Sequence, residues 1–396
     1  MRILLIATKT PWPPIDGGRL VLLNTIDALR EAGHDLTLVA PVDARYLNQK
    51  KVFENLSTRC SAHLIPVRTR SGFETIANAE VTGTPITIVR HSLQIIQKLT
   101  EELVKRHTFD VIHAEQLQAV SGTAAVRGNG IPVVLRSQNV ETALWTFAAS
   151  FRSPFTRWFF RREAARLARW EAKCLRGVAA TIALTDLDAV QMRSLAGPEA
   201  LIETVAPPFP AELAASPTKL PGNPAVVILA SRKWLPNRDA VWRFVARSWP
   251  RIYQVLPEAR LHVFGITESV DQSRGVEWHP APEKSEAAFP TGAVVAIPSR
   301  HPTGVPMKCL EAWARGLPVV GSPQAADQLK CRDRKAMLVA SGPEGFARAM
   351  VELYENPERV ETLVAEGRKL LRQNFDPARV AARLEEVYRK AGAESR

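Results

Sequence analysis

The segment best suited to chemistry is residues 302–320, which read PTGVPMKCLEAWARGLPVV. This pattern predicts a turn, a helix that opens at Pro306, and a strand that begins after Gly316. Lys308 and Glu311 are three residues apart, so they share one face of this helix. Backbone amides at a helix N-terminus and an ammonium group favour phosphate, whereas a carboxylate suits ribose hydroxyls. The segment therefore predicts a site for a nucleoside diphosphate.

Two adjacent cations follow another predicted strand, AVVILA at residues 225–230. They are Arg232 and Lys233, in the sequence SRKWLPN. Paired cations at the end of a buried strand suit a diphosphate, although a solvated turn can have the same composition. We expect Arg232 and Lys233 to bind the same ligand as Lys308.

Polar residues also end two strands predicted in the first half of the chain. His113 and Glu115 close the strand DVIHAE, and because they are two residues apart they point to one face. A histidine there can act as a base or donate a hydrogen bond, and a glutamate can act as a base or stabilise charge, but a purely structural role is as common. Asn139 and Glu141 follow the strand PVVLRSQ, where so many polar groups are hard to explain by packing.

Paired glycines, Gly17 and Gly18, follow the first predicted strand in the sequence PPIDGG and precede a predicted helix. Their bare amides could approach an anion or a sugar. The pattern is not GxGxxG and no acidic residue follows at the ribose position, which argues against NAD. Asp186 and Asp188 form a DxD pattern that can hold a divalent metal on a nucleotide sugar, but Thr185 before them indicates a helix cap, which we favour.

The elements that position these residues alternate between short apolar runs and helical patterns. Predicted strands lie at residues 2–8, 35–41, 62–67, 110–115, 132–138 and 180–185, and again at 225–230, 260–265, 293–298 and 317–322. These runs lack period-two alternation, as is typical of strands buried on both faces. Helical patterns such as residues 19–33 and 239–256 lie between them. The alternation predicts an α/β fold with parallel sheets covered by helices on both sides.

A stretch rich in Pro and Ala without periodicity, residues 205–224, divides this pattern in two. We predict an N-terminal Rossmann-like domain at residues 1–205, a second at 206–375, and a C-terminal helix at 376–396 that packs back on the first domain. Two such domains are expected to bind ligands at the carboxyl ends of their strands, in the cleft that they face across.

The composition is that of a soluble globular protein, with 396 residues, 46% of them apolar and 23% charged. The four cysteines are scattered without a CxxC pair, which favours reduced thiols over disulfides or a zinc site. The first apolar run is too short for a signal peptide, and no run reaches the roughly 20 residues of a membrane helix. We expect a cytoplasmic protein that needs no metal and no cofactor.

The net charge of +12 calls for an anionic partner. Basic residues concentrate in residues 151–176, which contain only two acidic residues and are interleaved with six aromatic ones. Such a segment is typical of a helix that lies on an anionic membrane, and a surface helix whose aromatics pack on their own domain is the alternative. We expect peripheral contact with the inner face of the cytoplasmic membrane. Binding of nucleic acid is not expected, because no helix-turn-helix, zinc or RNA-binding signature is present.

In the motifs described above and in their order along the sequence, the chain resembles the retaining glycosyltransferases of family four, which have the GT-B fold. The resemblance runs over nearly the whole length. The segment TGVPMKCLEAWARGLPVVGSPQ is similar to the family's donor signature, and this match is specific. The glycine loop, DVIHAEQ, LRSQNVE and SRKWLPNRDAVWRF support it by order and spacing.

The resemblance implies transfer of a sugar from a nucleoside-diphosphate donor to an acceptor hydroxyl, with retained configuration and without a metal. Glu311 matches the second glutamate of the signature, which binds the donor ribose, whereas Thr303 stands where the first glutamate is expected. The implied donor-binding residues are Arg232, Lys233, Thr303, Gly304, Val305, Lys308 and Glu311. The catalytic candidates are His113, Glu115, Lys308 and Arg232. The acceptor, carbohydrate or lipid-linked, would contact Gly17, Gly18, Asn139 and Glu141, in bacterial cell-surface polysaccharide or glycolipid assembly.

Two alternatives remain open on the sequence alone. A nucleotide-sugar 2-epimerase also has two Rossmann-like domains, but it needs an acid/base cluster that is not evident in the second half. A non-catalytic basic protein that binds nucleic acid or sugar is the alternative from another class.

Overall fold

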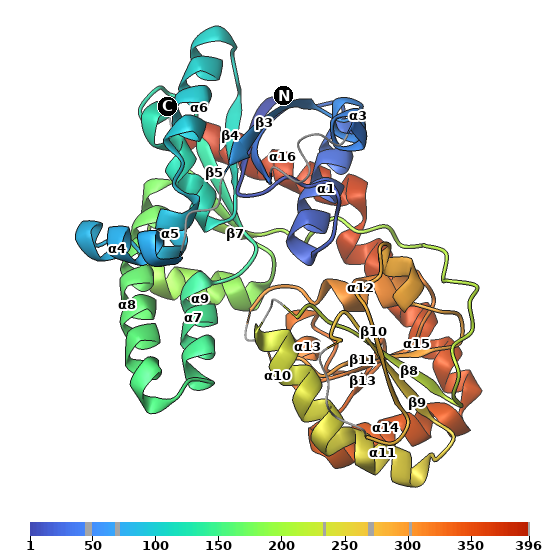
Figure 1. Cartoon of the computed structure of the whole chain (residues 1–396). Helices are drawn as coiled ribbons and strands as arrows, with labels where there is room; N and C mark the ends of the chain where they lie inside the picture. The colour runs from blue at the N-terminus through green and yellow to red at the C-terminus, as the bar shows by residue number, and fades with distance from the viewer. Residues whose placement is uncertain (44–49, 68–71, 233–234, 268–272, 301–302, 395–396) are drawn as a thin grey trace. The chain divides into compact units, whose positions relative to one another are not determined.

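A computed structural model describes residues 1–43, 50–67, 72–232, 235–267, 273–300 and 303–394 of the chain. The chain forms two compact units. Unit 1 comprises Met1–Pro208 and Pro377–Arg396, and unit 2 comprises Phe209–Asp376. Each unit contains one parallel sheet with helices packed on both sides (Figure 1).

The sheet of unit 1 has seven strands in the order β3-β2-β1-β4-β5-β6-β7, and every neighbouring pair is parallel. The strands are β1 (Arg2–Ala7), β2 (Asp35–Asp43), β3 (Ser61–Val67), β4 (Val111–Glu115), β5 (Val133–Ser137), β6 (Ala180–Ala183) and β7 (Ile202–Thr204). All five residues of β4 and of β5 are buried, which explains why these strands lack alternation.

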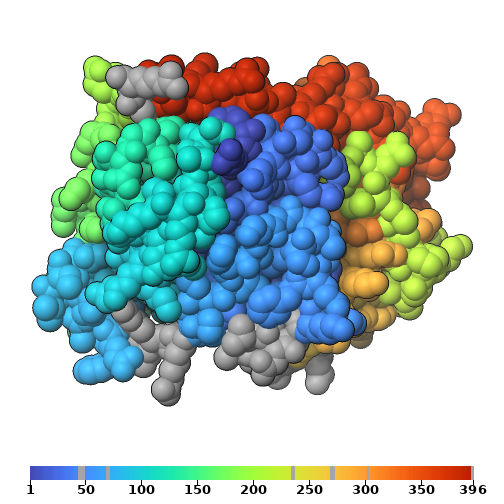
Figure 2. All heavy atoms as spheres, turned by 90° about the horizontal axis from the view of Figure 1, so that it is seen from above, coloured from blue at the N-terminus to red at the C-terminus, as the bar shows by residue number. Residues whose placement is uncertain are grey.

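The helices of unit 1 are α1 (Gly17–Glu31), α3 (Lys50–Ser57), α4 (Gly72–Thr82), α5 (Ile86–His91), α6 (Gln94–Arg106), the 3₁₀ helix η1 (Leu117–Val126), α7 (Glu141–Ser150), α8 (Pro154–Gly177), α9 (Asp186–Ala196) and α16 (Pro377–Glu394). The final helix, α16, lies beside the N-terminal segment of the chain (Figure 2). Its buried face includes Leu384, Val387 and Tyr388, which join Ile26 and Leu29 of α1 in one apolar cluster. The end of the chain thus completes the core of unit 1.

The sheet of unit 2 has six parallel strands in the order β10-β9-β8-β11-β12-β13. They are β8 (Ala225–Leu229), β9 (Arg260–Phe264), β10 (Val276–His279), β11 (Val294–Ile297), β12 (Val319–Gly321) and β13 (Leu338–Val339). The helices are α10 (Leu235–Arg243), the π-helix η2 (Phe244–Ser248), α11 (Trp249–Val255), the 3₁₀ helix η3 (Ser285–Ala288), α12 (Met307–Ala314), α13 (Pro323–Gln328), α14 (Gly342–Glu355), α15 (Pro357–Leu370) and the π-helix η4 (Leu371–Phe375).

The strand orders locate the ligand-binding edge of each sheet. In unit 1 the order reverses between the neighbours β1 and β4, and in unit 2 it reverses between β8 and β11. Ligands of open α/β sheets bind at the carboxyl ends of the strands at such a switch point. The candidate site residues lie at or after the carboxyl ends of strands at these switch points, in unit 1 those of β1, β4 and the neighbouring β5, and in unit 2 those of β8 and β11.

The observed helices and strands agree with some local predictions from the sequence and differ from others. Thr185 caps α9, with its hydroxyl accepting a hydrogen bond from the Asp188 amide at 3.1 Å. Trp278 and His279, which lie outside the strands predicted from the sequence, belong to β10. The helix predicted at residues 239–256 is interrupted by the π-turn of η2. Among the described residues, no helix combines the length and apolarity that crossing a bilayer requires.

Candidate active site

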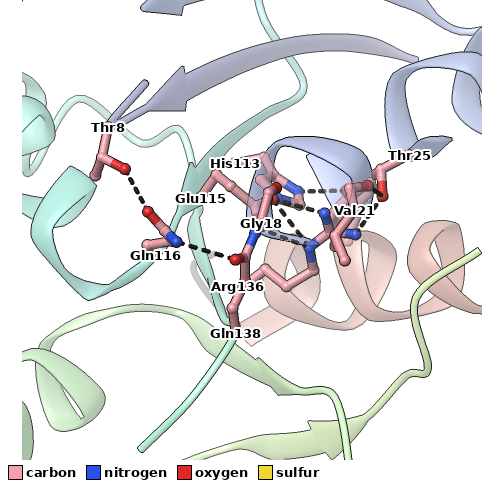
Figure 3. A network of polar contacts seen from close by, with 10 residues as sticks. Thr8, Gly18, Val21, Thr25, His113, Glu115, Gln116, Arg136 and Gln138 are labelled. Carbon is pink, nitrogen blue, oxygen red and sulfur yellow. Dashed lines mark hydrogen bonds and ion pairs between the residues drawn. The ribbon is translucent and has the colours of Figure 1, made fainter. Parts of the chain in front are cut away.

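At the switch point of unit 1, the Glu115 carboxylate is the centre of a buried polar network (Figure 3). It accepts a hydrogen bond from Arg136 Nε at 2.9 Å, one from His113 Nε2 at 3.0 Å and one from Gln138 Nε2 at 2.8 Å. Arg136 also donates to the Thr25 hydroxyl of α1 at 2.6 Å. Burial raises the pKa of Glu115, but the Arg136 guanidinium and the bond from His113 outweigh burial and lower this pKa to about 2. Glu115 is therefore ionised and fully paired.

The protonation of His113 follows from its two partners. Because a carboxylate only accepts, Nε2 holds the proton that is donated to Glu115, and Nδ1 accepts from the Tyr388 hydroxyl at 2.6 Å. Burial lowers the pKa of His113, against the influence of Glu115, and burial raises the pKa of Tyr388. His113 has no exposed surface. One ring nitrogen of His113 thus connects β4 to Tyr388 of α16, and the other is bonded to Glu115. The catalytic role suggested for His113 and Glu115 stays a prediction.

A chain of amide side chains connects this network to the glycine loop. Gln138 donates to the Gly18 carbonyl at 3.1 Å and accepts from Gln116 Nε2 at 2.9 Å, and Gln116 accepts in turn from the Thr8 hydroxyl. A Cβ at Gly18 would lie 2.5 Å from Gln138 Oε1 and 3.0 Å from Lys9 Nζ. A larger residue at position 18 would therefore displace the ends of the Gln138 and Lys9 side chains from their present contacts.

The predicted acceptor residues gather around the first turn of two helices. Gly17 and Gly18 open α1, whose cap is the Asp16 side chain, and Glu141 opens α7 two residues after Asn139. Asn139 and Glu141 are half-buried. Lys9, which the sequence did not single out, lies beside them: its ammonium pairs with Asp16 at 2.7 Å, and its charge acts on Glu141. This edge of unit 1 thus offers a cation, amide groups and a carboxylate to a polar ligand.

The Glu141 carboxyl lies near a second carboxyl group, that of the buried Glu171 of α8. Glu171 accepts hydrogen bonds from the Glu141 and Thr142 amides at 2.9 Å each. Burial and Glu171 raise the pKa of Glu141 from 4.5 to about 7. The folded protein therefore retains a proton that the unfolded chain releases near pH 4.5, so stability decreases as the pH rises from there to about 7.

Glu141→Gln is consequently expected to raise the free energy of unfolding at pH 8 by on the order of 1–2 kcal/mol, allowing for solvent screening of a half-buried group. The gain should shrink at pH 5, where folded wild type already holds the proton. Urea unfolding at the two pH values measures it, and Glu102→Gln on the exposed face of α6 controls for loss of a charge. Equal stability of wild type and variant at pH 8 would contradict the prediction.

In unit 2, helix α12 begins beside the switch point. Its buried face includes Leu310 and Trp313, and the Trp313 indole donates to the Ala336 carbonyl at 2.9 Å. Gly316 has a φ of 71°, and the amide that follows it bonds back to the Ala312 carbonyl at 2.9 Å, which ends the helix as predicted. Packing thus fixes the rotation of α12 about its own axis, and with it the direction of Lys308 and Glu311.

Glu311 is held by contacts that the sequence did not reveal. Its Oε1 atom accepts from Ser285 Oγ at 2.5 Å and from Arg315 Nη2 at 2.8 Å and Nε at 3.1 Å. Arg315 is in turn bonded to the Ala214 carbonyl. The other oxygen, Oε2, makes no hydrogen bond with a described residue. The carboxylate is therefore fixed through one oxygen, and the second can accept from a ligand hydroxyl.

The remaining predicted donor residues lie near the first turn of α12 or after β8. Lys308 is half-buried, and burial lowers its pKa to about 8, against the attraction of Glu311. Gly304 has a φ of 81°, and Thr303 beside it is buried. Val305 is half-buried, and its carbonyl accepts from the Met307 amide at 2.9 Å. Arg232 is exposed directly after β8, and Lys233 lies outside the described residues.

Comparison with known proteins matches both units. The family model described as glycosyl transferase 4-like domain matches residues 16–208, and the model described as glycosyl transferases group 1 matches residues 224–356. No curated protein sequence matches the chain.

Solved structures match over nearly the full length, at identities that show the fold alone. Sucrose-phosphate synthase from Thermosynechococcus elongatus is 14% identical with a TM-score of 0.73, and the match covers 99% of each chain. HepE from Anabaena, in complex with UDP and glucose, is 15% identical with a TM-score of 0.63, covering 98% of each chain. WaaG, a glycosyltransferase involved in lipopolysaccharide biosynthesis, is 13% identical with a TM-score of 0.58, covering 96% of this chain and 98% of its own.

Both family models describe transferases, which favours transfer over the epimerase and the non-catalytic alternatives. The matched solved structures share the two parallel-sheet α/β domains described above. The chain is therefore a glycosyltransferase with the GT-B fold.

Proposed function

We propose that this glycosyltransferase moves a sugar from a nucleoside-diphosphate donor, bound by unit 2, to an acceptor hydroxyl bound by unit 1, with retention of the anomeric configuration. The observation that carries the proposal is the geometry of α12. A half-buried ammonium and a carboxylate with one oxygen available lie on one helix beside the switch point of the sheet. This pairing suits the two ends of a nucleoside diphosphate.

The proposed chemistry depends on charge rather than on a strong base. As the glycosidic bond breaks, negative charge develops on the leaving diphosphate. Lys308, Arg232 and the amides near Gly304 would stabilise this charge, and one such donor typically contributes about 3–4 kcal/mol in the transition state. The acceptor proton would pass to the leaving phosphate, so the proposal assigns no metal and no cofactor to the transfer step. Glu311 would hold the ribose.

The acceptor proposed is a carbohydrate or lipid-linked sugar of bacterial cell-surface polysaccharide or glycolipid assembly. The biosynthetic role in the name of WaaG and the UDP and glucose bound to HepE support this direction. A panel of nucleotide sugars screened by thermal shift tests the donor. A ligand present at 100 times its Kd would stabilise the protein by about 2.7 kcal/mol. Absence of stabilisation by every nucleotide sugar at millimolar concentration would contradict the proposal.

We propose further that unit 1 associates with an anionic membrane through the exposed start of α8, a helix that ion pairs join to α4. Phe155 and Trp158 at the start of α8 are 92% and 64% exposed. Arg162 and Arg166 of α8 pair with Glu80 of α4. The aromatics Phe159, Phe160 and Trp170 of the same segment pack instead against their own domain. Within residues 151–176, the exposed apolar side chains Phe155 and Trp158 therefore form a small patch at one end of α8, with cations nearby.

A double variant, Phe155→Ser with Trp158→Ser, is expected to reduce flotation with anionic phosphatidylglycerol vesicles several-fold, because it removes apolar side chains that would enter the headgroup region. It keeps the Arg–Glu80 pairs between α8 and α4. Val255→Ser, at an exposed apolar side chain of unit 2, is the matched control and should float like wild type. Equal flotation of the double variant and wild type would contradict membrane contact through this patch.

A further inference from the structure

A cluster of two histidines and one glutamate lies at the edge of the unit 2 sheet, apart from the residues assigned above. His262 is in β9, and Glu277 and His279 are in the neighbouring edge strand β10. In this parallel pair Glu277 is the register partner of His262. Because Glu277 and His279 are two residues apart on one strand, their side chains leave the same face of the sheet. Three side chains that can ligate a metal therefore converge from two strands.

Two separations within the cluster are close to those of neighbouring ligands around one metal ion, and the third is within reach of them. His262 Nδ1 lies 3.0 Å from His279 Nε2 and 3.5 Å from Glu277 Oε2, and the ligand atoms of all three side chains lie within 4.8 Å of one another. Around a tetrahedral Zn²⁺ with Zn–N bonds of about 2.0–2.1 Å, neighbouring ligand atoms are separated by about 3.3 Å. Small adjustments of the side chains would thus bring all three atoms to bonding distance.

The orientation of His262 is fixed by its second nitrogen. Nε2 lies 2.9 Å from the Pro221 carbonyl oxygen, which can only accept, so Nε2 carries the proton and Nδ1 presents a lone pair to the cluster. A ligating histidine typically donates its other N–H to a carbonyl or carboxylate in this way. His262 is buried, and its ring stacks on that of His279 with centroids 5.2 Å apart. The central ligand of the cluster is therefore preorganised.

The outer side of the cluster is open to solvent. The Glu277 side chain is 41% exposed, and His279 is half-buried. Two imidazoles and one carboxylate make a donor set suited to Zn²⁺, and three protein ligands leave a fourth position for water. A hydrogen bond from His279 to His262 accounts for their 3.0 Å contact when no ion is bound. Upon binding, the neutral His279 ring would carry its proton on Nδ1, so that Nε2 could ligate.

We propose that His262, Glu277 and His279 bind a divalent transition-metal ion of the Zn²⁺ class, which would hold the edge strand β10 to β9. The proposal is independent of the donor site, and no step of the sugar transfer passes through the ion.

The test is a titration of chelator-treated, desalted full-length protein with Zn²⁺, in competition with a chromogenic chelator. We expect one equivalent bound with a Kd of about 1 µM or tighter. His279→Gln should weaken binding at least about 100-fold and Glu277→Gln about 10-fold, since each removes one ligand. His107→Gln, at an exposed histidine of unit 1, is the matched control and should bind like wild type.

X-ray absorption of the Zn²⁺-loaded wild type identifies the atoms that bind the ion, so the proposal can be tested even if a variant fails to fold. A shell of nitrogen and oxygen with imidazole scattering is expected, and sulfur from any of the four buried cysteines would overturn the assignment. Failure of wild type to bind one equivalent, or equal binding by folded His279→Gln, would also overturn it.

Discussion

Glu311→Gln is expected to reduce sugar transfer by about 100-fold or more while the protein stays folded. The glutamine oxygen can still accept from Ser285 and Arg315, so the contacts that fix the side chain remain. The amide nitrogen, however, replaces the oxygen that makes no hydrogen bond with a described residue, and an N–H cannot accept from a ribose hydroxyl. The loss should be greatest in donor affinity. It is measured as nucleoside diphosphate released at a series of donor concentrations.

Lys308→Ala tests the other end of the same ligand. If Lys308 stabilises charge on the leaving diphosphate, its loss should reduce kcat more than it raises KM. The pKa of about 8 also predicts how activity changes with pH. The Lys308 ammonium loses its proton as the pH rises through this value, so kcat/KM of the free enzyme should fall there. Lys308→Arg should remove this decline. Lys369→Ala, an exposed cation of α15, is the control, and normal turnover of Lys308→Ala would contradict the assignment.

The second large effect is expected in unit 1. Glu115→Leu should lower the free energy of unfolding by about 3–5 kcal/mol, because it leaves the Arg136 guanidinium buried without its partner. The double variant Glu115→Leu with Arg136→Met should lose much less than the sum of the single variants, since no uncompensated charge remains. Urea unfolding measures both. Additive losses in the double variant would show that the two side chains do not act as a pair.

The pH dependence of stability gives an independent check on this network. The pKa of Glu115 is lowered from 4.5 to about 2, so its stabilising contribution is complete above pH 4.5 and is lost as the pH falls toward 2. The double variant should lack this part of the acid sensitivity of wild type.

The sequence could predict those features whose signals are local. Pro306 before the helix and Gly316 after it marked the ends of α12, and the apolar runs marked the strands that are buried on both faces. The polar residues at strand ends were predicted to bind ligands, because parallel strands bring their carboxyl ends to one edge of a sheet. These signals need no knowledge of distant contacts, and they located the fold and the residues of α12.

The remaining features depend on contacts between distant parts of the chain. The partner of His113 is Tyr388, 275 residues away, and Ser285 reaches Glu311 from 26 residues before it. Nothing in the local sequence around these residues indicates the pairing. Strand β10 was missed because its four residues, VEWH, are only half-buried and contain two polar groups. The cluster of His262, Glu277 and His279 was missed with it, since His262 and Glu277 meet only when β9 and β10 pair.

The measurement that tests the central claim most directly is calorimetric titration of wild type, Glu311→Gln and Lys308→Ala with the nucleotide sugar that stabilises wild type most. The assignment of α12 as the donor site predicts one bound nucleotide sugar per chain, with affinity at least about tenfold weaker in each variant, equivalent to about 1.4 kcal/mol. Binding of the same donor with unchanged affinity by both folded variants would contradict it.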